Sequence, residues 1–420
     1  MGLSLKESLK EMGRFAKKSS KELSKLSSIE KNKILNSIKN SININRNKIL
    51  EENKKDYENG KNNGMSNALL DRLLLNDERI DSMIKSIDQI ILLEDPISKF
   101  KDVFTLNNGL IVAKKRVPIG VLAMIYESRP NVTLDSAVLA IKSSNSIILR
   151  GGKEAINSCI SIADAIRDGI ENAGYDKNMV QIVNDTTRES STELMKLKGY
   201  VDLLIPRGSA SLINAVIENA NVPTLETGVG NCHLYVDEFA DLNKAIKIFE
   251  NGKTQRIGVC NALESLLVNE KIADEFYPLL NNIIEKYDLK VHACYKSLSK
   301  VKNSTLATEE DFAKEYLDYE FSLKVVSTIE EAIEHIYKYS THHSDAIITE
   351  NLKNAKKFTD EVDSACVYVN ASTRFTDGYE FGYGGEIGIS TQRLHARGPV
   401  GLNELTTYKY VILGEGQIRE

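Results

Sequence analysis

Five cysteines are the first residues that could carry out chemistry. They lie far apart in the sequence, at Cys159, Cys232, Cys260, Cys294 and Cys366. Cys260 is set apart by its neighbours, because it follows a glycine and lies close to Lys253 and Arg256. Cations and free backbone N–H groups lower the pKa of a thiol and make it a nucleophile. A buried structural thiol is the equally weighted alternative for Cys260 and the favoured one for Cys159, Cys294 and Cys366.

Two glycine-containing turns have the composition of anion sites. Arg150-Gly-Gly-Lys153 and Pro206-Arg207-Gly208-Ser209 each follow an apolar strand-like segment and precede a helix-like one. Ser209 is a good N-cap residue, and the N–H groups of a helix start attract phosphate. Two ordinary strand-to-helix turns with surface cations are the alternative. The classical GxGxxG dinucleotide motif is absent from the sequence.

A third segment, Ala371–Gly401, combines seven glycines with the cations Arg374, Arg393 and Arg397. So much glycine beside so much positive charge is typical of an ordered functional loop. These arginines are predicted to bind an anionic substrate, and structural ion pairs are the alternative. No CxxC or HxxxH spacing suggests a metal site, so none is expected.

The elements that must position these residues change in character along the chain. Residues 1–93 show helical spacing of apolar residues, with a polar break at 58–64. Two β-rich arms around Asn107-Asn108-Gly109 predict a hairpin, and Thr406–Leu413 predicts a last strand. Strands and helices alternate from Val117 to residue 220 and again from Cys232 to Val369. This order predicts an α/β protein with two doubly wound parallel sheets.

Composition narrows the class of protein further. A chain of 420 residues with 42% hydrophobic and 27% charged residues is expected to form two or three soluble domains. The net charge of −5 gives no support to nucleic-acid binding, and a local +7 over residues 1–62 is read as a solvated helix face. Apolar runs are too short to cross a membrane, and the first residues lack the apolar core of a signal peptide. A cytoplasmic enzyme is expected.

Five segments together resemble the γ-glutamyl phosphate reductases, also called glutamate-5-semialdehyde dehydrogenases, a branch of the aldehyde dehydrogenase superfamily. The similarity runs essentially from end to end, and it is carried by Val117–Asp135, Ile147–Ala155, Lys253–Glu264, Val369–Gly378 and Gly385–Gly401. It implies NADPH-dependent reduction of L-glutamyl 5-phosphate to glutamate 5-semialdehyde, the second step of proline synthesis from glutamate. A hydrolytic or CoA-acylating aldehyde dehydrogenase is the enzyme alternative, and a non-catalytic binding protein is the alternative from another class.

The resemblance also implies roles for individual residues. The matching positions are Cys260 as nucleophile, Asn131 in the oxyanion hole, Arg207, Gly208 and Ser209 at the cofactor phosphates, Arg150 and Lys153 at the adenosine ribose, and Glu315 at the nicotinamide ribose. Glu226 has the spacing of the general base of hydrolytic relatives. Activated water would destroy a thioester intermediate, so a structural role for Glu226 is favoured over a catalytic one.

The same resemblance gives the expected organisation of the chain. Residues 1–102 and 117–230 are expected to form the cofactor domain, and 231–400 the catalytic domain. The hairpin 103–116 and the C-terminal 401–420 are expected to form an oligomerisation element of a homodimer or homotetramer. An upstream glutamate 5-kinase is an implied partner.

Overall fold

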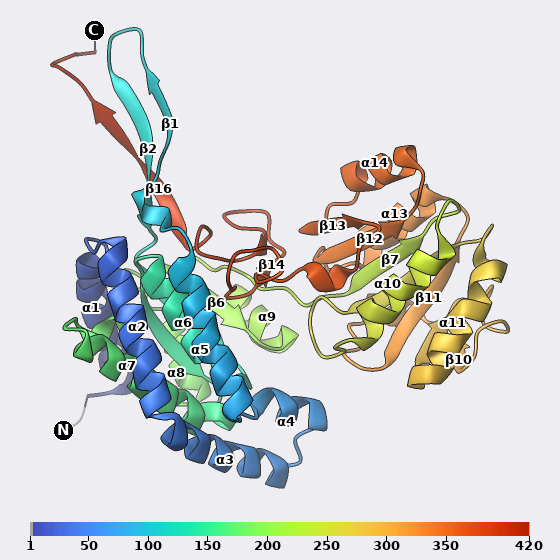
Figure 1. The fold of residues 1–420 in the computed structure, drawn as a ribbon, viewed down its shortest axis with the longest axis horizontal. Helices are drawn as coiled ribbons and strands as arrows, with labels where there is room; N and C mark the ends of the chain where they lie inside the picture. The colour runs from blue at the N-terminus through green and yellow to red at the C-terminus, as the bar shows by residue number, and fades with distance from the viewer. Residues whose placement is uncertain (1–2, 420) are drawn as a thin grey trace. The chain divides into compact units, whose positions relative to one another are not determined.

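The computed structural model describes residues 3–419, and its contacts divide the chain into two compact units. Unit 1 contains the chain up to Thr227, the segment Gly382–Gly388 and the residues from Val400 onward. Unit 2 contains Gly228–Phe381 and Ile389–Pro399. The glycine-rich segment therefore passes from unit 2 into unit 1 and back, whereas the sequence-based division placed 231–400 in one domain. Figure 1 shows the course of the chain.

Unit 1 is built on a parallel sheet of four strands. Its order is β5-β4-β3-β6, with β3 at Val121–Tyr126, β4 at Ser146–Gly151, β5 at Val180–Ile182 and β6 at Leu203–Arg207. Every residue of β3 and β4 is buried. Such continuous burial requires cover on both faces, which explains the apolar runs in the sequence.

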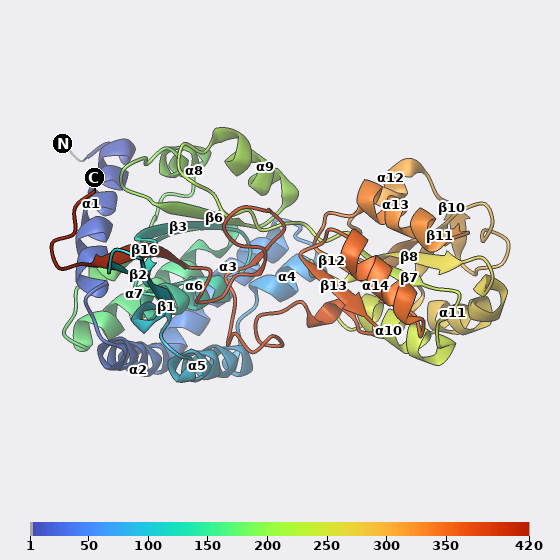
Figure 2. The same cartoon turned by 90° about the horizontal axis from the view of Figure 1, so that it is seen from above.

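Helices cover both faces of this sheet. Side chains of β3 that alternate from Val121 pack on α1, α8 and α9, and the opposite face meets α6, where Tyr126 and Thr133 share a hydrogen bond of 2.6 Å. The helices of unit 1 are α1 (Leu5–Leu23), α2 (Ser28–Ile44), α3 (Arg46–Asn62), α4 (Asn67–Leu73), α5 (Asp77–Leu92), α6 (Asn131–Lys142), α7 (Ile156–Asn172), α8 (Arg188–Met195) and α9 (Ala210–Asn219). Figure 2 shows this unit from above.

The predicted break at 58–64 is wrong in its position. Helix α3 continues through this polar segment to Asn62, and the chain turns only afterwards. Gly60 is buried there, and a Cβ atom at this position would lie 2.6 Å from the Met65 sulfur. The glycine permits close packing of the following turn rather than ending the helix.

A small antiparallel sheet completes unit 1. It contains β1 (Phe100–Thr105), β2 (Ile111–Pro118) and β16 (Thr406–Leu413) in the order β1-β2-β16. The predicted hairpin and last strand are therefore confirmed, and Gly109 takes the left-handed φ of 87° that the tight turn requires. The sheet projects from the rest of its unit (Figure 1) and leaves large apolar side chains exposed, among them Phe104, Tyr408 and Ile412.

Unit 2 contains a parallel sheet of seven strands in the order β10-β9-β11-β8-β7-β12-β13. The strands are β7 (Cys232–Val236), β8 (Leu263–Asn269), β9 (Lys290–Ala293), β10 (Ser304–Leu306), β11 (Glu320–Val326), β12 (Ser344–Ile348) and β13 (Cys366–Val369). Helices α10 (Leu242–Thr254) and α11 (Ala273–Tyr287) cover one face, and α13 (Ile329–Tyr339) and α14 (Leu352–Glu361) cover the other. The predicted fold class is thus confirmed.

Two short elements of unit 2 escape sequence reasoning. Strand β10 has three residues at the edge of the sheet, and α12 (Glu309–Ala313) has five. Both are too short for a hydrophobic pattern to repeat often enough to reveal them. They matter because they lead the chain to Glu315. The glycine-rich segment holds only the short pair β14 (Ile389–Ser390) and β15 (Gly398–Pro399) and a 3-10 turn, η4 (Thr373–Phe375).

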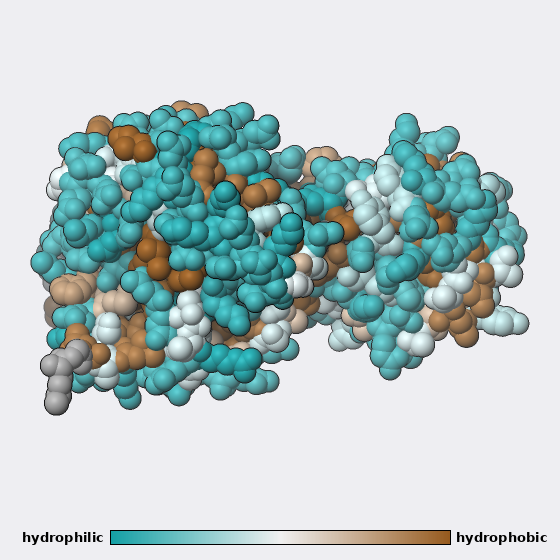
Figure 3. All heavy atoms as spheres, turned by 90° about the horizontal axis from the view of Figure 1, so that it is seen from below, coloured by the Kyte–Doolittle hydropathy of each residue, from teal (hydrophilic) through white to brown (hydrophobic). Residues whose placement is uncertain are grey.

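The surface is mainly hydrophilic on the face drawn in Figure 3, where apolar residues gather in small patches. Among residues 3–419 no helix has the length and apolar character that a membrane crossing needs.

Candidate active site

Cys260 lies on the segment that joins α10 to β8 in unit 2. Its side chain is half-buried, and its carbonyl oxygen accepts a hydrogen bond from the Cys232 thiol at 3.2 Å. Gly230 packs directly against that carbonyl, because a Cβ atom built on Gly230 would lie 1.4 Å from the oxygen. The backbone of the predicted nucleophile is therefore held from two sides.

The other cysteines are engaged in packing. Cys159 is fully buried and burial raises its pKa to about 11, while burial raises the pKa of Cys232 well above its ordinary range. Cys294 accepts the Val325 N–H at 3.3 Å, and Cys366 is buried in β13. A thiol with a raised pKa is a poor nucleophile. These surroundings favour Cys260 as the reactive thiol.

Arg374 interacts electrostatically with both Arg256 and the Cys260 thiol. Asn261, the next residue after Cys260, donates from its amide to the Thr376 carbonyl at 2.9 Å and accepts the Thr373 hydroxyl on its backbone carbonyl at 2.8 Å. This ties the turn that carries Arg374 to the nucleophile segment. The pKa of Arg374 is lowered, chiefly by burial and then by the nearby Arg256, whereas the Cys260 thiol acts in the opposite direction.

The predicted arginine cluster is divided in the structure. Arg374 donates from Nε to the Gln255 side chain at 2.8 Å, beside the nucleophile segment. Arg393 and Arg397 instead both pair with Asp363, where Arg397 also donates to the Asp363 carbonyl at 2.7 Å. Hydrogen bonding by Arg397 lowers the pKa of Asp363. Structural ion pairs were the alternative to substrate binding for all three arginines, and Arg393 and Arg397 make such ion pairs.

Glu315 lies on the turn that follows α12, in the same unit as Cys260. Its carboxylate accepts the backbone N–H of Gly230 at 2.7 Å, so one residue touches both Glu315 and the Cys260 carbonyl. The structure therefore brings the predicted nucleophile and the predicted ribose ligand together around Gly230, which sequence reasoning did not single out.

The predicted phosphate turn lies at the carboxyl edge of the sheet of unit 1. Strand order reverses between β3 and β6, and ligands of such sheets bind where the order reverses. Arg207, Gly208 and Ser209 follow β6 at this point, and Ser209 caps α9 by accepting the Leu212 N–H. The Ser209 N–H donates to the Glu127 carboxylate at 2.8 Å. A carboxylate thus already occupies this helix start, where the partial positive charge of the helix N-terminus favours an anion.

The two cations predicted at the adenosine ribose differ in their surroundings. Arg150 is buried, and its Nη2 donates to the carbonyls of Thr186 and Thr187 at 2.7 and 3.0 Å. Burial lowers its pKa, and its Nε is buried without a hydrogen-bond partner in the part of the chain that the structure describes. Lys153 is exposed at the start of the following 3-10 turn. Lys153 is the cation better placed to meet a soluble ligand.

Asn131 opens α6 and is paired within its own helix. Its amide donates to the Asp135 carboxylate at 2.9 Å, one helical turn later. Burial raises the pKa of Asp135 to about 6, against the opposing effect of this hydrogen bond. One N–H of the Asn131 amide is thus used for orientation, and an amide nitrogen has a second one for an oxyanion. The sequence pattern did not reveal Asp135 as the partner of Asn131.

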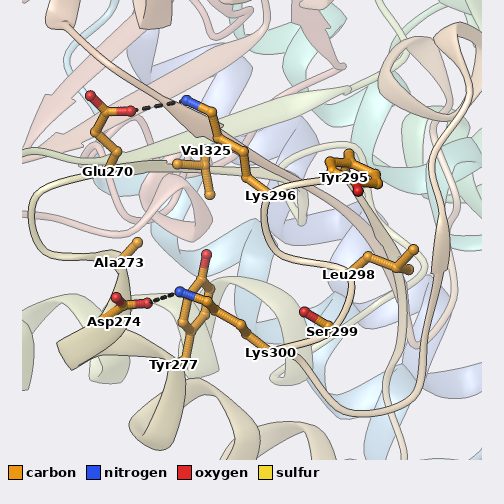
Figure 4. A pocket seen from close by; sticks show the side chains of 10 residues that line it. All are labelled: Glu270, Ala273, Asp274, Tyr277, Tyr295, Lys296, Leu298, Ser299, Lys300 and Val325. Carbon is orange, nitrogen blue, oxygen red and sulfur yellow. Dashed lines mark hydrogen bonds and ion pairs between the residues drawn. The ribbon is translucent and has the colours of Figure 1, made fainter.

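A pocket of about 520 Å³ lies at the opposite end of β8 from Cys260. Figure 4 shows its lining, in which Lys296 pairs with Glu270 at 2.9 Å and Lys300 pairs with Asp274. Glu270 follows β8 directly and Cys260 precedes it, so a separation on the order of 20 Å is expected from the rise of a seven-residue strand. The pocket is not part of the thiol site. Among residues 3–419 no cluster of His, Cys, Asp and Glu side chains is arranged to hold a metal.

Comparison with known proteins identifies the family of this chain. The model of the aldehyde dehydrogenase family matches residues 3–314.

The chain belongs to the aldehyde dehydrogenase family.

Two relatives within that family carry the same name. A protein of Clostridium perfringens named gamma-glutamyl phosphate reductase is 53% identical over 407 residues, which cover 97% of this chain and 98% of the relative. A protein of Petrotoga mobilis with the same name is 51% identical, with 99% and 100% covered. The resemblance stated from the sequence motifs is confirmed.

Solved structures support the same placement. The crystal structure of a gamma-glutamyl phosphate reductase from Thermotoga maritima is 50% identical, with a TM-score of 0.95 and 98% of this chain and all of that chain covered. An acetylating aldehyde dehydrogenase of Geobacillus thermoglucosidasius is 20% identical with a TM-score of 0.69, and this likeness shows the fold alone. This aldehyde dehydrogenase thus combines a family fold with the motifs of one branch.

Proposed function

We propose that this aldehyde dehydrogenase reduces L-glutamyl 5-phosphate to L-glutamate 5-semialdehyde and phosphate with NADPH, the second step of proline synthesis from glutamate. Relatives about half identical over nearly the whole chain carry the name of that reductase, and this is the observation that carries the proposal. The half-buried Cys260, with its backbone fixed and a cation beside it, gives the chemistry a nucleophile.

Enzymes of this family use a nicotinamide cofactor, and the described residues fit one. Gly208 packs so closely on the Glu127 carboxylate that a Cβ atom would lie 2.4 Å from it, so this turn has no space for a side chain at position 208. Arg207 and Lys153 offer positive charge for phosphates at the reversal point of the sheet, and a phosphate at the start of α9 would take the place of the Glu127 carboxylate that now accepts the Ser209 N–H. We assign the phosphates to Arg207, Gly208 and Ser209, and the 2′-phosphate side of the ribose to Lys153 and Arg150, of which Arg150 also holds the carbonyls of Thr186 and Thr187. A cationic ribose turn favours NADPH over NADH.

Cys260 performs the covalent step. Its thiolate attacks C5 of the acyl phosphate, the carbon–oxygen bond to phosphate breaks, and a thioester forms on the sulfur. We assign the transient oxyanion to the Asn131 amide and the Cys260 backbone N–H, donors whose loss costs about 3–4 kcal/mol in comparable sites. A nicotinamide cofactor held by the residues named above would supply the hydride that reduces the thioester on Cys260. The resulting thiohemiacetal then collapses, releasing the semialdehyde and restoring the thiolate.

Glu315 and the arginines are assigned to ligand binding rather than to the covalent step. We assign the nicotinamide ribose to Glu315, whose contact with Gly230 orients its carboxylate. Arg374 and Arg256 supply positive charge for the phosphate or the α-carboxylate, since burying these charges without partners is costly. We assign Arg393 and Arg397, which the sequence predicted as substrate ligands, a structural role, because both pair with Asp363.

Two further features complete the proposal. The exposed apolar side chains of β1, β2 and β16 favour strand pairing with a second copy, in a homodimer or a dimer of dimers. We place the enzyme in the cytoplasm, where an upstream glutamate 5-kinase would deliver the labile acyl phosphate.

Assay of the reverse reaction tests the function. Purified enzyme is given glutamate 5-semialdehyde and NADP with phosphate, with CoA, or with neither, and the product is identified. We expect NADPH formation that depends on phosphate, with NAD a poorer cofactor. Formation of glutamate without phosphate would establish a hydrolytic enzyme, and dependence on CoA a CoA-acylating one. Glu226→Gln should leave the phosphate-dependent rate nearly unchanged, because no water needs activation.

A further inference from the structure

A fully buried ion pair lies beside the nucleophile segment. Lys253, near the end of α10, and Glu264, in β8, have no exposed side-chain surface, and Nζ lies 2.8 Å from Oε2. Burial lowers the pKa of Lys253 and raises that of Glu264 to about 7. Desolvation of two charges commonly outweighs their attraction, so a buried pair is poor evidence of stability alone.

Glu264 makes further contacts that connect it to the cofactor side of the site. Its Oε2 accepts the Tyr316 backbone N–H and its Oε1 accepts the Leu317 backbone N–H, each at 3.3 Å. Leu317 has a φ of 55°, a left-handed conformation that is costly for leucine. The Glu264 carboxylate, held by Lys253, therefore stabilises a strained turn.

The residue before this turn is Glu315. Its carboxylate receives the Gly230 N–H at 2.7 Å, and Gly230 lies against the Cys260 carbonyl. A continuous set of contacts thus runs from Lys253 through Glu264 and the turn to Glu315, and from there through Gly230 to the nucleophile.

We propose that the Lys253–Glu264 pair is a positioning device that fixes the Glu315 turn relative to Cys260, so that Glu315 is ready to receive the cofactor. This inference rests on the proposed function, because that function assigns the nicotinamide ribose to Glu315. Neither member of the pair reaches a ligand, since both are buried. Their effect is on cofactor affinity and on hydride transfer through the placement of Glu315.

Variants that remove the charges of Lys253 and Glu264 distinguish an effect on the position of Glu315 from an effect on protein stability. Glu264→Gln retains the shape but has one acceptor oxygen in place of two, so one turn N–H loses its partner. Glu264→Gln or Lys253→Met alone leaves one buried charge unpaired and should lower the melting temperature. The double variant Lys253→Met/Glu264→Gln contains neither charge and should regain most of that loss.

Cofactor binding is measured by NADPH fluorescence titration alongside thermal unfolding. We expect the dissociation constant to rise about ten-fold in Glu264→Gln, the value of one hydrogen bond, and to stay raised in the double variant although its stability returns. If the affinity returns together with the melting temperature, or never changes in a folded variant, the pair is only structural. Should Glu264→Gln fail to fold, the double variant decides the outcome.

Two comparisons sharpen the test. Glu315→Gln combined with the double variant should add little further loss of NADPH affinity, because both changes act on the same carboxylate. Lys31→Met/Asp95→Asn removes a comparable buried pair in unit 1, whose atoms lie 2.5 Å apart, and should leave NADPH affinity unchanged. Full additivity, or equal loss in this control, would overturn the inference. Phosphate-dependent turnover of the unmodified enzyme is measured beside these, so that failure of the proposed function is recognised separately.

Discussion

Gly230→Ala tests how closely the backbone controls the nucleophile. The new Cβ atom would lie 1.4 Å from the Cys260 carbonyl oxygen, whereas ordinary contacts of this kind begin near 3.4 Å. Because the opposing atom belongs to the backbone, rotation of a side chain cannot relieve the clash. The two segments must separate by about 2 Å, which displaces Cys260 and weakens the Gly230 contact with Glu315.

A displacement of this size has a predictable kinetic effect. Misplacement of a reacting group by 1 Å typically costs about 100-fold in rate, so kcat/KM of Gly230→Ala should fall at least about 100-fold. The assay is phosphate-dependent oxidation of glutamate 5-semialdehyde, with circular dichroism to establish folding. Gly252→Ala is the matched control, because Gly252 lies in α10 and its Cβ would come no closer than 3.3 Å to Leu263 and 3.8 Å to Ser372. A folded Gly230→Ala enzyme within about three-fold of the control would refute this reasoning.

Further changes probe charge and pH. Lys153→Ala should lower kcat/KM for NADPH about ten-fold and leave that for NADH unchanged, and equal effects on both cofactors would remove Lys153 from the 2′-phosphate. Arg374→Ala should raise KM for the semialdehyde about ten-fold or more, whereas Arg397→Ala should lower the melting temperature with KM nearly constant; the reverse pattern would exchange their roles. Burial lowers the pKa of His335 to about 2, and both its ring nitrogens are buried without partners among the described residues. Only the unfolded chain then binds a proton at His335 between pH 6.5 and 2, so stability falls as pH falls, by about 2 kcal/mol at pH 5. His335→Phe should reduce this loss in urea unfolding at pH 7.5 and pH 5, and an unchanged loss would contradict the role of His335.

Much of the fold could be predicted because its pattern is local. Buried parallel strands are continuous apolar runs, and the glycine of a tight turn is visible in the sequence, as at Gly109. The polar break near Gly60 was placed wrongly because packing against Met65, rather than local propensity, determines the helix there. Strand β10 was missed because three residues are too few for an alternating pattern to be recognised.

The site was predictable where residue type alone indicates chemistry. The cationic, glycine-framed context left Cys260 evenly balanced between nucleophile and structural thiol, the family resemblance indicated the nucleophile, and the structure gives three of the other cysteines buried surroundings. The contact of Gly230 with the Cys260 carbonyl joins residues thirty positions apart, and the sequence indicated Lys253 as a cation near Cys260 rather than as the buried partner of Glu264. Only tertiary packing reveals such contacts, and the same holds for the ion pair of Arg397 with Asp363.

The central claim is that Cys260 carries the acyl group as a thioester that phosphate, not water, releases. Enzyme mixed with glutamate 5-semialdehyde and NADP without phosphate, then quenched in acid, should show about one NADPH per chain and a glutamyl adduct confined to the Cys260 peptide by mass spectrometry. Addition of phosphate before the quench should remove the adduct and restart turnover, and Cys260→Ala should show neither burst nor adduct. Steady turnover without phosphate, or a burst that survives in Cys260→Ala, would contradict the account.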